Sequence, residues 1–153
     1  MTGPYQGSGN NDEWGQAYAE NLNTIMSGDL SVIDARYDRA AIGAYPNHQT
    51  AIGKPDITAF WAGLRASFPS AQFTIHHQIG RDDSMMPPRA AIRWSLSGKH
   101  EGAGRFGTPS GADIYVMGIS HAEFGPWGLR REYTLLDDVA IWKQIHLHTG
   151  DLS

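Results

Sequence analysis

The chain has 153 residues, a formal net charge of −4 and no cysteine, which suits one soluble domain and excludes disulfides, thiolate nucleophiles and cysteine metal sites. Because lysine and arginine do not cluster, nucleic acid is not an expected partner. No apolar run is long enough to span a bilayer, so no membrane contact is expected. The polar, glycine-rich N-terminus lacks the basic and apolar regions of a secretory signal, which predicts a cytoplasmic protein.

The first half of the chain predicts helices. Asn11 or Asp12 can cap a first helix. Its apolar residues recur at spacings of three and four, at Trp14, Tyr18, Leu22 and Ile25. A short helix at about 31–37 and an extended segment at about 40–45 should follow. Lys54-Pro55-Asp56 opens a third helix, because proline is tolerated in the first turn and an acid is favourable near the positive end of the helix dipole.

The second half predicts strands, because apolar residues alternate with a period of two. An alternating strand at about 73–79 comes first, and longer strands are expected at about 90–100, 112–124 and from 129, joined by short links as in an antiparallel meander. One face of the 90–100 strand contains Ile92, Trp94, Leu96 and His100. Helices followed by an antiparallel sheet give an α+β fold in which the helices cover one sheet face.

The stretch from Leu129 to Gln144 runs from a strand into two consecutive aspartates. Strand alternation places Asp137 on the same face as Tyr133 and Leu135. If that face lines a pocket, poor solvation favours the protonated form of Asp137, which could then exchange protons near neutral pH. Asp138 is interpreted as the cap of a short terminal helix. The alternative is that Asp137 merely caps that helix.

Five stretches in this order resemble one family: 53–57 (GKPDI), Phe68-Pro69, 93–100 (RWSLSGKH), 106–111 (FGTPSG) and 132–137 (EYTLLD). Together, over about 14–144, the chain resembles the SnoaL-like polyketide cyclases of the nuclear-transport-factor-2-like superfamily. The resemblance implies a cone, in which a strongly bent antiparallel sheet wraps around N-terminal helices and leaves a pocket at the open end. It also implies a homodimer paired through the sheet.

In those cyclases an aspartate acts as acid and base in an intramolecular aldol ring closure, without metal or organic cofactor. Asp137 matches the family's final aspartate, so the resemblance implies an enzyme of this kind acting on a small apolar carbonyl compound. Leu135 stands where some cyclases have a histidine, and Thr134 stands where the related epoxide hydrolases would have an acid. The alternatives are a non-catalytic binding protein for a small hydrophobic ligand, an isomerase or hydrolase of the superfamily, or a dimerisation module with a filled cone.

His100 matches the family's histidine after the glycine, and it is predicted to bond a substrate carbonyl or to orient Asp137. The alternative is a structural histidine bonded to loop backbone. The remaining candidates are aromatic or lie on apolar faces, and they are predicted to bind substrate unless they simply pack in the core. They are Tyr18, Tyr45, Trp61, His77, Trp94, Phe106, Met117, His121 and Tyr133.

Three further expectations concern polar residues and chain organisation. Asn47 and His48 either border the pocket mouth or form a solvated turn, and the turn is preferred. Arg93 and Glu132 are expected on the face opposite Tyr133, where an ion pair between them is preferred to contact of Arg93 with a dimer partner. His146 and His148 lack a third ligand, so no metal site is predicted. The expected organisation is a flexible leader at 1–11, a single domain at 12–148 and a tail at 149–153.

Overall fold

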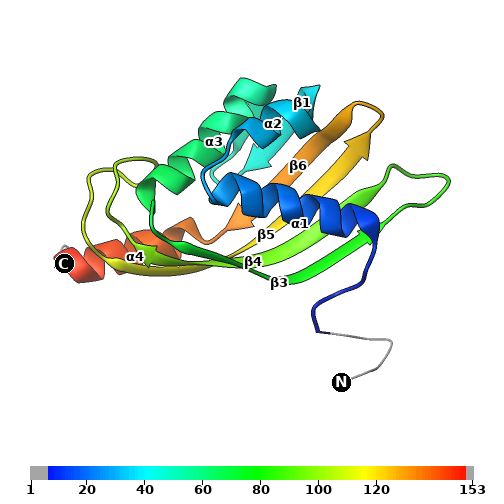
Figure 1. Ribbon diagram of the computed structural model, residues 1–153. Coiled ribbons are helices and arrows are strands. Elements are labelled where there is room, and N and C mark those ends of the chain that lie inside the picture. Colours follow the sequence, from blue (N-terminus) through cyan, green and yellow to red (C-terminus); the bar gives the residue numbers. More distant parts are fainter. Residues whose placement is uncertain (1–6, 151–153) are drawn as a thin grey trace.

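The computed structural model describes residues 7–150, which form a six-stranded, strongly bent sheet with helices on its concave side (Figure 1). The strands are β1 (Tyr37–Tyr45), β2 (Gln49–Ile52), β3 (Gln72–Arg81), β4 (Arg89–Lys99), β5 (Asp113–Gly125) and β6 (Gly128–Leu136). Their order is β2-β1-β6-β5-β4-β3. β1 and β6 are parallel, and the other neighbours are antiparallel. The predicted α+β class and antiparallel meander are confirmed.

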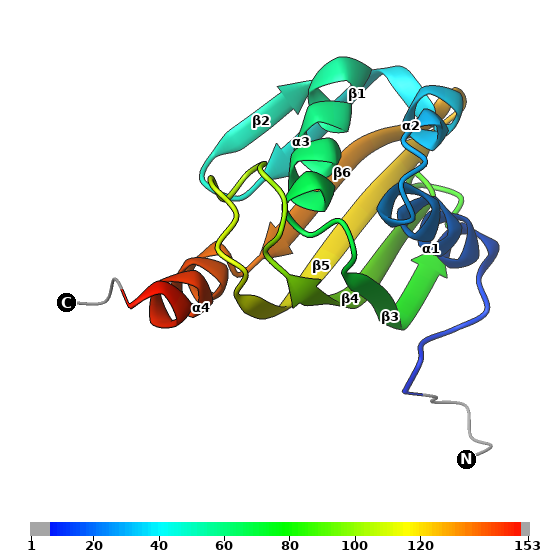
Figure 2. The same cartoon turned by 60° about the vertical axis from the view of Figure 1, so that its left-hand side comes forward.

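The helices are α1 (Glu13–Met26), α2 (Ser31–Arg36), α3 (Lys54–Ser67) and α4 (Asp138–Thr149). Figure 2 shows α1, α2 and α3 on the concave side of the sheet, whereas α4 lies beyond one end of it. The Asp12 side chain accepts a hydrogen bond from the Trp14 backbone N–H and so caps α1, as predicted. Proline in the first turn of α3 also agrees with the prediction.

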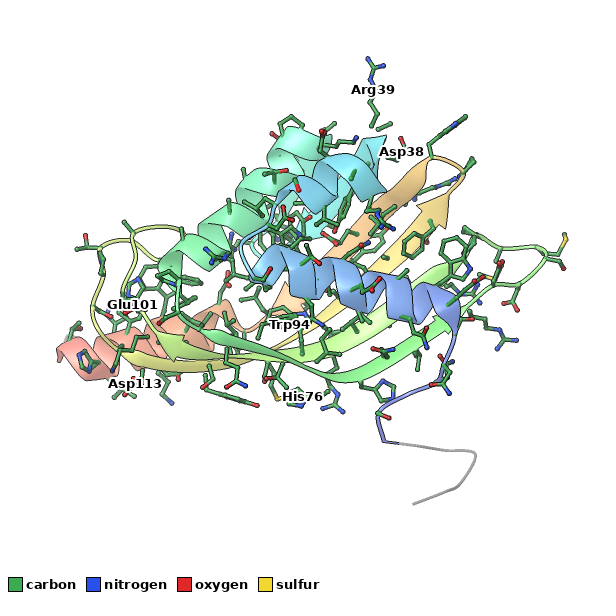
Figure 3. The ribbon with its side chains drawn as sticks, in the orientation of Figure 1. Asp38, Arg39, His76, Trp94, Glu101 and Asp113 are labelled. Carbon is green, nitrogen blue, oxygen red and sulfur yellow. The ribbon has the colours of Figure 1, made fainter. Side chains whose placement is uncertain are left out.

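The core fills the space between the concave sheet face and these helices. Trp94 and Trp61 are fully buried there. Figure 3 shows Trp94 pointing from β4 toward α1, while His76 of β3 lies on the opposite side of the sheet. The Trp94 indole N–H donates to Ser120 Oγ on β5 at 3.1 Å. The predicted inward face of β4 is therefore correct.

Bulges interrupt the regular alternation of the long strands. One lies between Ile75 and His77 on β3, and another lies on β6, where Arg130 is the extra residue opposite Glu123 and Phe124 of β5. Because a bulge adds one unpaired residue and bends its strand, these irregularities contribute to the curvature of the sheet. The predicted run of one face through Ile75 and His77 is wrong, since the extra residue separates them.

Two short segments extend the sheet at its edges. β2 was not predicted, because the stretch at 49–52 is too short to display a period. At the other edge, Asn10 N–H donates to the Gln78 carbonyl at 3.0 Å, and Gln78 N–H donates to the Ser8 carbonyl at 2.9 Å. Residues 8–10 of the predicted leader are thus bonded to β3, while 1–6 and 151–153 lie outside the described residues. Within 7–150, no helix is both long and apolar enough to cross a membrane.

Gly118 of β5 lies directly against the Trp94 ring, so a larger residue at this position should destabilise the fold. A Cβ added at Gly118 would lie 2.2 Å from Trp94 Cζ2. We expect Gly118→Ala to lower the free energy of unfolding by about 1–3 kcal/mol, as overpacking does, measured by urea denaturation. Gly63→Ala in α3 is the control, since its methyl would only approach Arg105 Cβ at 4.0 Å and should stabilise the helix by up to about 1 kcal/mol. Equal midpoints for the two variants would contradict this packing.

Candidate active site

A buried carboxylate lies at the centre of the concave face. Glu132 of β6 is fully buried, and both of its oxygens accept hydrogen bonds. Oε2 accepts from the hydroxyls of Tyr18 at 2.8 Å and Tyr37 at 2.5 Å. Oε1 accepts from the Tyr45 hydroxyl at 2.7 Å and from the Trp61 indole N–H at 2.8 Å. We call these five residues the Glu132 cluster.

The donors of the Glu132 cluster are all neutral side chains. Burial, and next the nearby Glu132 charge, raise the pKa of Tyr18, Tyr37 and Tyr45 well above the ordinary value. The three hydroxyls therefore keep their protons and remain donors. A buried acceptor with this many donors is well satisfied, and these five side chains rigidify the interior of the cone.

A second polar group lies at the open end, where the β1–β2 turn, the β4–β5 loop and α4 meet (Figure 2). A pocket of about 520 Å³ opens there, and we call it the mouth pocket. Its size is within the range of small-molecule sites. The lining residues are Asn47, Gln49, Arg105, Phe106, Asp138 and Trp142.

Asp138 is the acid of the mouth pocket. Its Oδ2 accepts from Arg105 Nη2 and from Asn47 Nδ2, both at 2.9 Å. Its side chain is only 10% exposed, and Oδ1 is buried with no hydrogen-bond partner among the described residues. A buried acceptor without a partner is uncommon and costly, and such groups are often found at functional sites. One oxygen is thus held in place by two donors, while the other is buried and has no hydrogen-bond partner within residues 7–150.

Arg105 is fixed by three contacts besides Asp138. Its Nη1 donates to Gln49 Oε1 at 2.8 Å, and its guanidinium lies 5.3 Å from the centroid of the Phe60 ring. Its backbone N–H donates to the Gly63 carbonyl of α3 at 3.2 Å. These contacts order a loop residue, and the remaining guanidinium N–H groups can donate to a ligand.

Aromatic rings supply the apolar part of the mouth pocket. Phe106 and Trp142 lie 5.5 Å apart between centroids in an edge-to-face arrangement, and Phe106 also contacts Phe68. Trp142 is partly exposed and Phe106 is buried. A flat apolar molecule can therefore pack against Trp142 while polar groups of the same molecule meet Asp138 and Arg105.

The structure exchanges the positions predicted for the two aspartates. Asp137 is exposed, and its Oδ1 accepts from the Ala140 N–H at 2.9 Å, so Asp137 and not Asp138 caps α4. The predicted inward placement of Asp137 is wrong, because Tyr133 and Leu135 of the same face are 42% and 70% exposed. The opposite face of β6, which contains Glu132, points inward. A catalytic role for Asp137 remains a prediction, but the buried environment on which that prediction depended is absent at this exposed residue.

His100 lies outside the mouth pocket lining. It is fully buried, and its Nδ1 accepts from the Ser110 backbone N–H at 3.2 Å and lies 2.9 Å from Ser110 Oγ. Burial lowers the pKa of His100, which favours the neutral ring. Its Nε2 is buried without a partner among the described residues. These contacts correspond to the structural alternative, and a catalytic role for His100 also stays a prediction.

The predicted substrate-binding residues fall into three groups. Phe106 lines the mouth pocket, and its role in binding substrate stays a prediction. Tyr18, Tyr45, Trp61 and Trp94 lie in the interior, where they contact other core side chains and not the mouth pocket. The remaining residues lie on other parts of the sheet, and they are His77, Met117, His121 and Tyr133.

Most of these residues lie on the outer face of β5 and β6 and not in the interior. Met117 is 48% exposed, and His121 stacks on Tyr133 at 5.8 Å between centroids on that face. The predicted ion pair of Arg93 with Glu132 is also wrong, because Arg93 is exposed and Glu132 points into the core. For Tyr133 and Glu132 the error lies in the inward side chosen for β6, which is the reverse of the one in the structure.

Sequence reasoning missed Arg105 and Asp138 as site residues and preferred a solvated turn for Asn47. Asn47 and His48 have positive φ angles of 66° and 58°, a conformation that asparagine tolerates better than most residues. An asparagine after a proline at the end of a predicted strand was the available signal for such a turn. Nothing local in the sequence indicated that this turn would contact Asp138.

Comparisons with known proteins agree with this architecture. A family model for the SnoaL-like domain matches residues 16–129, so the chain belongs to the SnoaL-like family. No curated protein matches it. Among solved structures it is similar to a protein from Jannaschia sp. CCS1 described as a candidate SnoaL-like polyketide cyclase. That similarity has a TM-score of 0.71 and 15% identity, and covers 89% of this chain and 96% of the other.

Two further structures show the same likeness. A candidate SnoaL-like polyketide cyclase from Shewanella denitrificans OS-217 matches with a TM-score of 0.68 and 20% identity, over 90% of this chain and 99% of the other. AclR from Streptomyces galilaeus, described as a candidate hydroxylase, matches with a TM-score of 0.70 and 16% identity, over 92% and 98%. At these identities the likeness establishes the fold alone.

The Glu132 cluster predicts a large effect on stability. Glu132→Leu would leave several buried donors without an acceptor, and each such loss costs roughly 1–3 kcal/mol. We expect a total loss of at least about 3 kcal/mol in the free energy of unfolding, measured by urea denaturation.

The matched control for this variant is Thr134→Val, two residues along on the same face of β6. It removes one neutral hydrogen bond to Ser120 Oγ and should cost only about 1 kcal/mol. A Glu132→Leu protein as stable as Thr134→Val would show that the cluster does not hold the interior together.

Proposed function

We propose that this protein is a small-molecule enzyme, similar to a polyketide cyclase, that uses Asp138 as acid and base at the mouth pocket. The observation that supports this most directly is the unequal setting of the two Asp138 oxygens. Oδ2 is held by Arg105 and Asn47, while Oδ1 is buried and has no partner in the described part of the chain. A positioned carboxylate with one unpartnered oxygen is suited to removing a proton from a bound molecule.

The proposed reaction is an intramolecular aldol addition, which needs only a base and a hydrogen-bond donor. Asp138 Oδ1 removes a proton from carbon next to a carbonyl, and an N–H of Arg105 stabilises the negative oxygen of the resulting enolate. The enolate carbon then bonds to a second carbonyl carbon of the same molecule. The alkoxide formed there takes the proton back from Asp138, so the product is an isomer of the substrate. No metal or organic cofactor takes part in these steps.

The substrate that fits this proposal is a small apolar carbonyl compound with a flat ring. Phe106 and Trp142 provide apolar contact area, and Asn47 and Gln49 provide polar groups at the edge of the mouth pocket. The family's cyclases support this choice by analogy, since likeness of fold alone does not determine chemistry. If the pocket binds such a molecule without proton transfer, the protein is a binding protein of the same fold.

Hydrogen–deuterium exchange tests the proposed base directly. α-Tetralone in deuterium oxide should exchange its α-protons faster with the wild-type protein than in buffer, followed by proton NMR. We expect Asp138→Asn to lower the protein-catalysed rate by at least about 100-fold, because general-base catalysis typically contributes that much. Asp113→Asn, an exposed acid paired with Lys99, is the control and should exchange like wild type.

The outcomes separate the proposals. An Asp138→Asn protein that exchanges at the wild-type rate contradicts the role of Asp138. Asp137→Asn tests the aspartate predicted from the sequence, and loss of exchange there alone would favour Asp137. Quenching of tryptophan fluorescence by α-tetralone, with no exchange above buffer, would support the binding protein.

We also propose that a second copy of this chain covers the outer face of β5 and β6. The outward face of an antiparallel sheet is usually polar when it faces water. Here it presents apolar side chains, which are Tyr115, Met117, Ile119, Tyr133 and Leu135. Two shallow pockets of about 410 and 360 Å³ on this face share Ile119 and Leu135 in their lining. Glu123 and Arg131 lie 4.0 Å apart on the same face. In a two-fold dimer the negative charge of one copy can therefore face the positive charge of the other.

A charge placed on this outer face should separate the copies. We expect Leu135→Glu to elute as a monomer in size-exclusion chromatography with light scattering, because a carboxylate buried in an apolar interface is strongly unfavourable. Met85→Glu, in the exposed loop between β3 and β4, should leave the wild-type mass unchanged. A monomeric wild-type protein at tens of micromolar would refute the dimer.

A further inference from the structure

We infer that Glu132 is a positioning residue for the mouth pocket, acting through Tyr45 on both side chains that hold Asp138. This inference rests on the function proposed for that pocket. Glu132 itself does not line the pocket. Its influence passes through the Tyr45 hydroxyl, which donates to Glu132 Oε1 at 2.7 Å.

The first link joins the Glu132 cluster to Arg105. The Tyr45 ring stacks on Phe60 with centroids 3.7 Å apart and planes 1° from parallel. The Arg105 guanidinium lies 5.3 Å from the centroid of the same Phe60 ring. Phe60 is therefore in contact with Tyr45 and with Arg105, and its position depends on how Tyr45 is held.

The second link joins the Glu132 cluster to Asn47. Tyr45 is the last residue of β1, and only Pro46 separates it from Asn47. Proline fixes its own φ, and Asn47 adopts a positive φ of 66°. This short, constrained path carries the Asn47 amide to Asp138 Oδ2 at 2.9 Å. A shift of Tyr45 should therefore move the amide as well.

Both links end at the same atom. Arg105 and Asn47 donate to Asp138 Oδ2, and their joint position determines where Oδ1 lies. A base must be placed accurately relative to the proton that it removes, because small displacements reduce the rate strongly. By anchoring Tyr45, Glu132 thus contributes to catalysis without touching the substrate.

The cluster contains a matched pair of donors that makes the inference testable. Tyr37 also donates its hydroxyl to Glu132, but to Oε2 and from the opposite end of β1. Tyr45→Phe and Tyr37→Phe each delete one buried hydroxyl bonded to the same carboxylate, so both should lower stability to a similar extent. Only Tyr45→Phe should disturb the mouth pocket.

Heteronuclear NMR of the side chains provides a readout that does not need a substrate. In Tyr45→Phe we expect the Asn47 side-chain amide to exchange with water about 10-fold faster than in wild type, because its bond to Asp138 opens more often. In Tyr37→Phe the Asn47 rate should stay at the wild-type value. Equal rates in the two variants, whether both are raised or both are unchanged, would overturn the inference.

Kinetics and a second variant complete the experiment. With α-tetralone we expect Tyr45→Phe to lower the maximal exchange rate by about 10-fold, and Tyr37→Phe to stay close to wild type. If the wild-type protein shows no exchange, the proposed function fails, while the amide measurement still decides the positioning role. If Tyr45→Phe does not fold, Glu132→Gln replaces it. An Asn47 amide exchange rate in Glu132→Gln equal to that of wild type would overturn the inference.

Discussion

The buried carboxylate of Glu132 joins parts of this molecule that are distant in sequence. Its partners come from α1, from both ends of β1 and from α3, while Glu132 itself belongs to β6. An ionisable group is costly to bury without partners, so the helices and β1 must approach β6 closely enough for every donor to reach it. This requirement specifies the interior arrangement more narrowly than apolar packing alone, which tolerates many combinations of side chains.

Much of the fold could be predicted because helical spacing and strand alternation are local signals. Trp94 illustrates success, since polar neighbours on the other face of β4 made its side unambiguous. β5 illustrates the limit, because Val116 points inward and Met117 points outward, yet both are apolar. Alternation cannot identify the inner face when both faces are apolar. On β6 the usual pattern is inverted, because Glu132 and Thr134 are buried while Tyr133 and Leu135 are exposed. Placing the apolar residues inward therefore gave the reverse of what the structure has.

The candidate site was less predictable, because its contacts join residues remote in sequence. Arg105 and Asp138 are bonded side chains from a loop and a helix, and neither has a local pattern that indicates the other. The adjacent aspartates were recognised as having separate roles, but a cap and a pocket residue look alike in sequence. Which of them points inward depends on where the helix begins, and such boundaries are the least reliable part of any prediction from sequence.

Two adjacent residues of the β4–β5 loop line the mouth pocket, the charged Arg105 and the apolar Phe106. The loop is also bonded to α3, through Gly102 N–H to the Ser67 carbonyl and Arg105 N–H to the Gly63 carbonyl. An insertion elsewhere in this loop would therefore leave both side chains in place, whereas a change between these two bonds would displace them together. Insertions elsewhere in the loop can therefore alter the rim of the site during evolution while Asp138 and its partners are retained.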